Sequence, residues 1–303
     1  MQRRFHFYST RFLAWARDAL HPTTVDVYAH YFRRFEKEVG DVQMQRIKPC
    51  VLSAWARTWH ESQAIVRLFR WCVDDAGLLR SNPVAHAKHP PKGQRRRTLT
   101  PREEKKLIRA TSGEFMALLI GYRETMARPG ELRAARWADV HPQAPPARLR
   151  KLLREGKAFI VLWDYKSRKR RRLPNEPRVI LLSPCIGRLL ARRLRPHQPT
   201  SAPLFPNTRG GHWTANAVRC RMRRLRAALD LGPDSRGENI VPYSFRHTGA
   251  TLASALGIRD RLLADALGHT ETATTKRYQH LQPSHVQRAL RPLWAVRVRG
   301  LAS

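Results

Sequence analysis

The sequence predicts a mainly α-helical fold with a small β-hairpin or sheet, an α+β arrangement in two domains. Apolar residues recur at the spacing of helix faces along most of the 303 residues. Two short runs, 158–163 and 178–182, instead have the β-branched and aromatic composition of strands. A basic, proline-containing stretch at 88–99 divides the chain, and the 42% apolar content is enough for two hydrophobic cores.

Residues 1–87 are predicted to form a small bundle of four helices, the first at roughly 10–20. The second helix has an apolar stripe from 25 to 39, with Thr23 or Thr24 as its cap and Gly40 at its end. Two further apolar stripes, which we interpret as packing surfaces, complete the bundle: Leu52–Trp59 and Ile65–Cys72.

The stretch 88–99 is expected to be an interdomain linker, because its prolines stiffen the chain and its like charges repel and extend it. Two interpretations stay open. It is either a charge run in solvent or a linker that lies along a nucleic acid with its cations on phosphates. On the second interpretation the contacting side chains are Lys92, Arg95, Arg96 and Arg97.

Residues 100–303 are predicted to form the second domain. It begins with a helix that is capped by Thr100, has Pro101 in its first turn and carries Glu103 at the capping-box position. The next helix, 115–125, is apolar on most sides and is expected to be deeply buried. A helix that opens at Pro129 and includes Trp137 follows.

The second half of this domain combines the two predicted strands with a series of helices. The strands flank a long basic segment, 164–176, which is expected to be a hairpin or loop. Helices are expected at 184–195, 214–229, 244–256, 259–267 and about 284–296, with Gly257 and Gly268 as the C-caps of the third and fourth. The last helix is expected to dock either on its own domain or on a neighbouring protomer.

The charge balance indicates a nucleic-acid partner. Lys and Arg number 58 against 23 Asp and Glu, a formal net charge of +35. Arginine dominates, and its planar guanidinium makes two-pronged contacts with phosphate oxygens. Helix 214–229 is expected to lie in or across a groove of DNA, with Arg219, Arg223 and Arg226 as contacts. No apolar run reaches membrane-spanning length, so no membrane partner is expected.

The cysteines and the N-terminus bear on cofactors and location. The four cysteines are dispersed without a C-x-x-C pair, which argues against zinc and fits a reducing cytosol. The N-terminus lacks the long apolar core of a signal peptide, so a cytoplasmic, nucleoid-associated protein is expected. No Walker-type glycine loop and no carboxylate cluster is evident, so no metal or other cofactor is expected.

Three short motifs and a late tyrosine carry the candidate chemistry. In chain order they are Arg128-Pro129-Gly130-Glu131-Leu132, Arg246-His247-Thr248, Leu267-Gly268-His269 and Tyr278. Two arginines, two histidines and a tyrosine suggest a site for a phosphodiester. Neighbouring cations favour the phenolate form of a tyrosine and neutralise phosphate charge, so the tyrosine oxygen can serve as a nucleophile.

These motifs, in this order and spacing, resemble those of the tyrosine recombinase (phage integrase) family. The helical first domain resembles the core-binding domain of its compact, Xer-like two-domain members. The resemblance implies that Tyr278 attacks a DNA phosphorus and forms a 3′-phosphotyrosine. It also implies that Arg128 and Arg246 bind the non-bridging oxygens, and that His269 hydrogen-bonds the phosphate or moves a proton.

Other roles in the family fall on supporting residues. The leaving 5′-oxygen needs a proton, which the family takes from a lysine on a β-hairpin; Lys166 is the candidate here, with Lys157 and Lys169 as rivals. Glu131 is expected to pair with a nearby cation or backbone donor and so to fix the first motif. His247 is expected to support the site from beside the second arginine.

Two positions depart from the family pattern. Tyr243 stands where the family often has histidine, and its hydroxyl can donate a hydrogen bond but cannot act as an imidazole acid or base. Met126-Ala127 stands where Gly-Leu is usual, and we interpret this as a change in packing.

The resemblance implies a metal- and ATP-independent site-specific recombinase that acts on double-stranded DNA as a homo-tetramer, or together with a paralogous recombinase. One alternative is relaxation of supercoiled DNA by the same chemistry, in the manner of type IB topoisomerases. Another is a catalytically silent DNA-binding architectural protein. The core-binding domain favours recombination over relaxation, and the intact set of Arg128, Arg246, His269 and Tyr278 argues against a silent protein.

Overall fold

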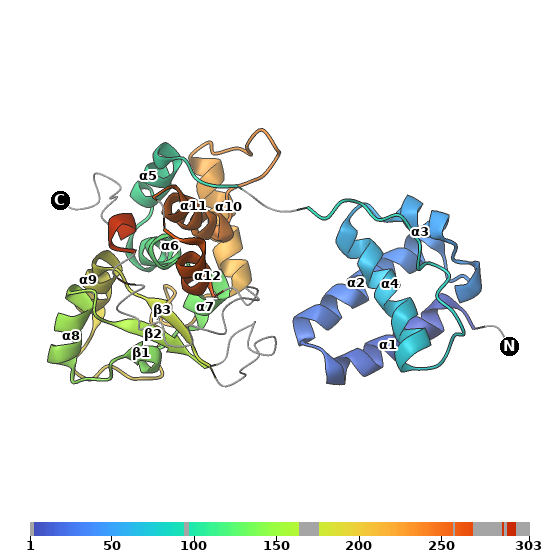
Figure 1. Cartoon of the computed structure of the whole chain (residues 1–303), viewed down its shortest axis with the longest axis horizontal. Coiled ribbons are helices and arrows are strands. Elements are labelled where there is room, and N and C mark those ends of the chain that lie inside the picture. Colours follow the sequence, from blue (N-terminus) through green and yellow to red (C-terminus); the bar gives the residue numbers. More distant parts are fainter. Residues whose placement is uncertain are drawn as a thin grey trace. The chain divides into compact units, whose positions relative to one another are not determined.

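The structure, a computed structural model, describes residues 3–93, 97–163, 176–256, 258–268, 287 and 290–294. The chain divides into two compact units, Met1–Gln94 and Arg95–Ser303 (Figure 1). The division lies inside the segment 88–99 that the sequence marks as a linker. Each unit has its own buried core, as the composition leads us to expect.

The first unit is helical throughout its regular structure. Its α-helices are α1 (Phe5–Ala19), α2 (Pro22–Val39), α3 (Pro49–Trp55) and α4 (Trp59–Arg70), with a 3₁₀ turn η1 (Met44–Arg46) and a π-helical turn η2 (Trp71–Asp75). Aromatic rings fill the space between them. For example, Phe12 contacts both Phe32 and Trp71 edge to face, with ring centroids 5.5 Å apart in each pair.

Some boundaries in this unit differ from the prediction. α1 begins at Phe5, earlier than expected, because that side chain is fully buried and its amide binds the carbonyl of Val42 at 2.8 Å. α2 ends before Gly40 as predicted, but its cap is His21, whose Nδ1 accepts from the amide of Thr23.

The predicted stripe Leu52–Trp59 is divided between two helices. α3 stops at Trp55, and Thr58 caps α4 through a reciprocal pair of hydrogen bonds with Glu61. Capping boxes of this kind start helices, so the chain must break the helical path before Thr58.

The second unit combines helices with a small sheet. The helices are α5 (Pro101–Arg109), α6 (Gly113–Thr125), α7 (Pro129–Ala134), α8 (Pro146–Arg154), α9 (Pro184–Arg193), α10 (Ala215–Ala228), α11 (Pro242–Ala255) and α12 (Asp260–Leu267). The strands β1 (Val140–His141), β2 (Phe159–Leu162) and β3 (Arg178–Leu181) form an antiparallel sheet in the order β1-β2-β3. The predicted fold class, mainly α with a small sheet, is confirmed.

The centre of this unit is α6, which is buried on nearly all sides as predicted and packs against α11 and α9 (Figure 1). The capping box predicted for α5 is also present, since Thr100 and Glu103 exchange hydrogen bonds of 2.8 and 3.2 Å. Within the described part of the chain, no helix is long and apolar enough to cross a membrane.

Three elements of this unit were not anticipated. They are strand β1, helix α8 and the 3₁₀ turn η3 (Trp137–Asp139). The predicted helix that opens at Pro129 was expected to include Trp137, but α7 ends at Ala134. Trp137 instead lies in η3, because Asp139 accepts from the amide of Arg136 and closes that turn.

The expected last helix could dock on its own domain or on a neighbouring protomer, and its described residues favour its own domain. Leu290 and Leu293 are buried in one cluster with Leu263 and Leu267 of the same unit. The indole nitrogen of Trp294 donates to the carbonyl of Glu124 at 3.3 Å. These described residues therefore pack on their own domain.

Candidate active site

Arg128 is held at the start of α7 by Glu131. The Glu131 carboxylate accepts from the Arg128 amide and from its Nη1, both at 2.8 Å. Arg128 Nη2 donates to the carbonyl of Gly268 at 2.9 Å. The carboxylate thus makes the contacts expected of it, with a cation and a backbone donor. A guanidinium has five N–H donors, so these contacts orient it without using all of them.

Arg246 joins two helix ends from its place on α11. It is only 2% exposed, and its Nη1 donates to the carbonyl of Met126 at 2.6 Å while its Nη2 donates to that of Leu267 at 2.7 Å. Met126 caps α6 with a φ of +51°, in the left-handed region. That backbone reversal lies where α6 ends and the segment leading to Arg128 begins.

Both arginines therefore meet at the C-terminal end of α12. Arg246 binds the Leu267 carbonyl and Arg128 binds the next one, of Gly268. The last carbonyls of a helix have no partner within the helix and carry partial negative charge, so cations are favoured there. The sequence separates these arginines by more than a hundred residues, and α12 brings them together.

A third arginine, which the sequence analysis missed, binds the same helix end. Arg178 lies on β3, and its Nη1 donates to the carbonyl of Asp265 at 2.9 Å while its Nη2 donates to that of Ala266. It is 2% exposed. The sequence did hold one indication of this position. Side chains alternate between the two faces of a strand, so Arg178 lies on the same buried face as Ile180 and Leu182.

Gly268 is required by two features of this contact. Its φ is +64°, which side chains with a Cβ adopt only with strain. A Cβ at this position would also lie 2.6 Å from Nε of Arg178, too close for any real contact. The glycine of the third motif is therefore explained by how closely Arg178 approaches the helix end.

Among the described residues, this cluster holds three arginines and the carboxylate of Glu131. That carboxylate pairs with Arg128, and its Oε2 lies 3.9 Å from Arg178 Nε. Burial lowers the pKa of Arg246, and the charge of Arg128 lowers it further, while Tyr243 and Glu131 act in the opposite direction. A buried excess of cations is stabilised by an anion, and a phosphodiester is an anion with suitable acceptors.

Two supporting residues lie beside Arg246. Its Cζ is 5.8 Å from the ring centroid of Tyr243, which is 38% exposed. The Tyr243 ring meets the His247 ring edge to face, with centroids 4.9 Å apart. Burial lowers the pKa of His247, the charge of Arg246 lowers it further, and Glu238 opposes both effects. The neutral imidazole is favoured there.

The remaining catalytic candidates, Lys166, His269 and Tyr278, lie outside the described residues, as does the rival Lys169. The other rival, Lys157, is described: its Nζ forms an exposed ion pair with Glu155 at 2.8 Å. Among the described residues, no group of three or more His, Cys, Asp or Glu side chains is placed to hold a metal ion.

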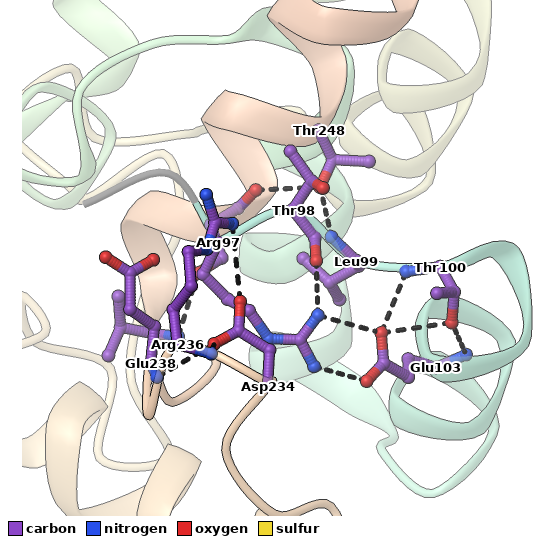
Figure 2. Close-up of polar contacts among 11 residues, drawn as sticks. Arg97, Thr98, Leu99, Thr100, Glu103, Asp234, Arg236, Glu238 and Thr248 are labelled. Carbon is purple, nitrogen blue, oxygen red and sulfur yellow. Dashed lines mark hydrogen bonds and ion pairs between the residues drawn. The ribbon is translucent and has the colours of Figure 1, made fainter. Parts of the chain in front are cut away.

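Arg97 differs from the expected phosphate-contacting linker cation. It is 8% exposed and forms an ion pair with Glu103 at the start of α5 (Figure 2). Next to it, the amide of Leu99 donates to Oγ1 of Thr248 at 2.8 Å. Glu103 also caps α5, so Arg97 neutralises a carboxylate that the helix start already requires. These contacts fasten the end of the linker to α5 and α11.

The other candidate DNA contacts have varied surroundings. Lys92 Nζ lies over the ring of Trp59, 4.8 Å from its centroid. On α10, Arg223 is exposed, Arg226 is half-buried, and Nη2 of the exposed Arg219 binds Asn216 at 3.1 Å. Arg95 and Arg96 lie outside the described residues.

Known proteins match this chain in sequence and in fold. The model of the phage integrase family matches residues 97–285, well over half of the chain. The chain belongs to the phage integrase family. The family resemblance expected from the motifs is thereby confirmed, and the matched region contains all three motifs and Tyr278.

Two relatives illustrate the extent of the similarity in sequence. The tyrosine recombinase XerC of Rhodospirillum centenum is 37% identical over 86 residues, which are 28% of this chain and 24% of the relative. The chain thus matches about a quarter of the length of that relative. The phiRv2 prophage integrase of Mycobacterium tuberculosis is 25% identical over 269 residues, which are 83% of this chain and 69% of the relative.

Two solved structures share the fold. A lambda integrase dimer bound to a COC′ core site has a TM-score of 0.66 at 14% identity, covering 94% of this chain and 77% of that chain. The Tn1549 transposon integrase in complex with circular intermediate DNA has a TM-score of 0.61 at 15% identity, covering 95% of this chain and 98% of that chain.

Proposed function

We propose that this chain is a site-specific recombinase that cuts and rejoins double-stranded DNA through a 3′-phosphotyrosine on Tyr278. The observation that carries the proposal is the convergence of Arg128 and Arg246 on consecutive carbonyls at the end of α12, directly before His269. Fixed donors that meet at one place are the means by which enzymes stabilise charge that develops in a transition state.

In the proposed reaction the Tyr278 oxygen passes its proton to His269 or to solvent and bonds to phosphorus while the bond from phosphorus to the 5′-oxygen breaks. The leaving oxygen takes a proton from Lys166, the candidate general acid. Arg128 and Arg246 bind the non-bridging oxygens, and losing one such donor raises a barrier by about 3–4 kcal/mol. Attack by a 5′-hydroxyl reverses the steps and rejoins the strand. The phosphotyrosine bond conserves the energy of the phosphodiester, so rejoining consumes no ATP, and the proposed mechanism assigns no step to a metal ion.

The proposed assembly is a tetramer on DNA, formed by this chain alone or with a paralogous recombinase, because exchange between two duplexes needs four cleavages. A structure of similar fold, with a TM-score of 0.67, is a lambda integrase tetramer bound to a Holliday junction. We place this activity in the cytoplasm, at the nucleoid. The proposed phosphate contacts are Lys92, Arg95, Arg96, Arg219, Arg223 and Arg226.

The proposal is tested by capturing covalent complexes. The purified chain is incubated with nicked fragments of genomic DNA from its source organism, and the DNA that stays attached to protein in SDS is sequenced. We expect attachment at one site, with Tyr278 carrying the nucleotide in mass spectra, and none with Tyr278→Phe. Tyr31→Phe, on α2 of the first unit, is the matched control and is expected to form the adduct normally.

Three outcomes would count against the proposal. Adducts formed equally by Tyr278→Phe would remove that residue from the reaction. Relaxation of supercoiled plasmids by a monomer at unrelated sequences would indicate the topoisomerase alternative. Sequence-specific binding by the wild-type chain without any adduct would indicate an architectural protein.

A further inference from the structure

We propose that Arg178 is a positioning residue that fixes the C-terminal end of α12 against β3, and so fixes the point from which the chain continues to His269 and Tyr278. This inference rests on the proposed function. It assigns a role to a side chain that lies outside all three motifs.

The contacts of Arg178 join two elements. Its Nη1 donates to the carbonyl of Val179 on its own strand at 3.0 Å and to that of Asp265 on α12 at 2.9 Å, and its Nη2 donates to Ala266. Its Nε lies 3.9 Å from the Glu131 carboxylate that also holds Arg128. One buried side chain thus contacts the strand, the helix end and the anchor of the first motif.

The position of this contact gives it functional weight. β3 follows the segment 164–175 that contains Lys166, and α12 ends at Leu267, two residues before His269. The two carbonyls that Arg178 binds directly precede the two bound by Arg246 and Arg128. A shift of this helix end would therefore displace both phosphate-binding arginines and the start of the segment that leads to the nucleophile.

The chemistry of the site requires arginine. A guanidinium presents donors along two edges in a fixed plane, whereas a lysine ammonium is a single point on a flexible stem. A buried cation is costly unless several acceptors surround it, which makes Arg178 a poor choice for packing alone. Gly268 is adapted to it, since any Cβ there would collide with Nε, Cδ and Cζ of Arg178.

The first experiment compares cleavage with binding. Arg178→Met and Arg178→Lys are measured for affinity to the mapped duplex and for single-turnover covalent attachment to its nicked form. Displacing a reacting group by about 1 Å costs on the order of 100-fold in rate, so we expect attachment to slow by about that factor for Arg178→Met.

The affinity of Arg178→Met for the duplex should stay within about threefold of wild type. Arg178→Lys should recover only a small part of the rate, because a lysine cannot bind the carbonyls of both Asp265 and Ala266. The exposed Arg148→Met, on α8, is the control and should match wild type.

The second experiment needs no DNA. The free energies of unfolding of Arg178→Ala, Gly268→Ala and the double variant form a thermodynamic cycle. We expect Gly268→Ala to destabilise the wild type more than it destabilises Arg178→Ala, because the collision needs the guanidinium. Additive effects would show that the close approach is not formed in solution.

The outcomes separate the two proposals. A wild type that forms no covalent adduct removes the proposed function, and with it the positioning role, even if the cycle shows coupling. A folded Arg178→Met that cleaves within about threefold of wild type, or that loses affinity and rate in parallel, overturns the positioning role alone. If Arg178→Met does not fold, the rate and affinity of Arg178→Lys decide the matter by the same criteria.

Discussion

At the scale of single residues, Met126 shows how the site accepts backbone strain. Met126-Ala127 stands where the family usually has Gly-Leu, and the Met126 side chain is fully buried. The residue also has a φ of +51°, a left-handed conformation that glycine adopts without strain but that costs a methionine about 1–2 kcal/mol. Its carbonyl binds Arg246, so that strain is retained where it places an acceptor for a site residue.

His247 leads to a prediction about pH. Its pKa in the folded chain is lowered, first by burial and then by Arg246, whereas in the unfolded chain it returns to about 6.5. The unfolded state therefore binds more protons in this range, and stability falls as pH drops through about 6.5 toward the folded value.

We expect His247→Gln to remove part of the loss in Tm between about pH 7.5 and 5.5. Thermal unfolding at a series of pH values measures this, with His197→Gln, an exposed histidine of the same unit, as the control. A pH dependence of Tm that is identical in wild type and His247→Gln would contradict the lowered pKa.

The site residues differ in how far the sequence could reveal them. Arg128, Glu131 and Arg246 belong to motifs with characteristic neighbours, so their spacing was enough to single them out. Arg178 binds backbone carbonyls, which every residue possesses, and such partners leave no mark in the residue types. The sequence offers only the inward-facing position of Arg178 on its strand, and its partners become visible when the end of α12 and strand β3 are placed in space.

At the scale of elements, boundaries with side-chain or glycine signals were predicted well. Thr100 with Glu103 starts α5, Gly40 follows α2 and Gly268 follows α12, as expected from their chemistry. Helix α8 was missed because its two buried leucines, Leu149 and Leu153, are embedded in basic residues after a run rich in proline. Strand β1 has two residues, too few for any periodicity.

The contact between α6 and α11 gives a prediction about stability. A Cβ on Gly249 would lie 2.8 Å from the carbonyl oxygen of Arg123 and 2.7 Å from Cγ of Met126. The methionine can adjust but the helix backbone cannot, so Gly249→Ala must separate the two helices. We expect a loss of about 1–3 kcal/mol in the free energy of unfolding, measured by urea titration.

Gly232→Ala provides the matched control for this substitution. Nothing lies within 4 Å of a Cβ at that position, so the alanine there should leave stability unchanged or raise it slightly. Equal unfolding free energies for Gly249→Ala and wild type would show that α6 and α11 pack less closely than described.

At the scale of the whole molecule, the charge of +35 predicts steep salt dependence of DNA binding. The logarithm of the binding constant should fall with the logarithm of salt concentration by about 0.9 per neutralised phosphate. We expect Arg223→Met, at an exposed position of α10, to reduce this slope by about 1. Fluorescence anisotropy at several salt concentrations measures the slope.

Arg97→Met is the informative companion to that variant. The sequence marks both arginines as phosphate contacts, but the Arg97 guanidinium already has the carboxylate of Glu103 as its partner. Its replacement should leave the slope unchanged. A reduced slope for Arg97→Met with no change for Arg223→Met would reverse the assignment of these two cations.

The bond between Leu99 and Thr248 has a mechanical consequence. Thr248 is two residues from Arg246 on the same helix, so the incoming chain is attached close to the arginine that we propose to bind phosphate. A force on the linker that is transmitted through this hydrogen bond would act on α11 before it reached the rest of the unit. Tension along the chain that enters the second unit would therefore be felt first next to Arg246, a catalytic candidate.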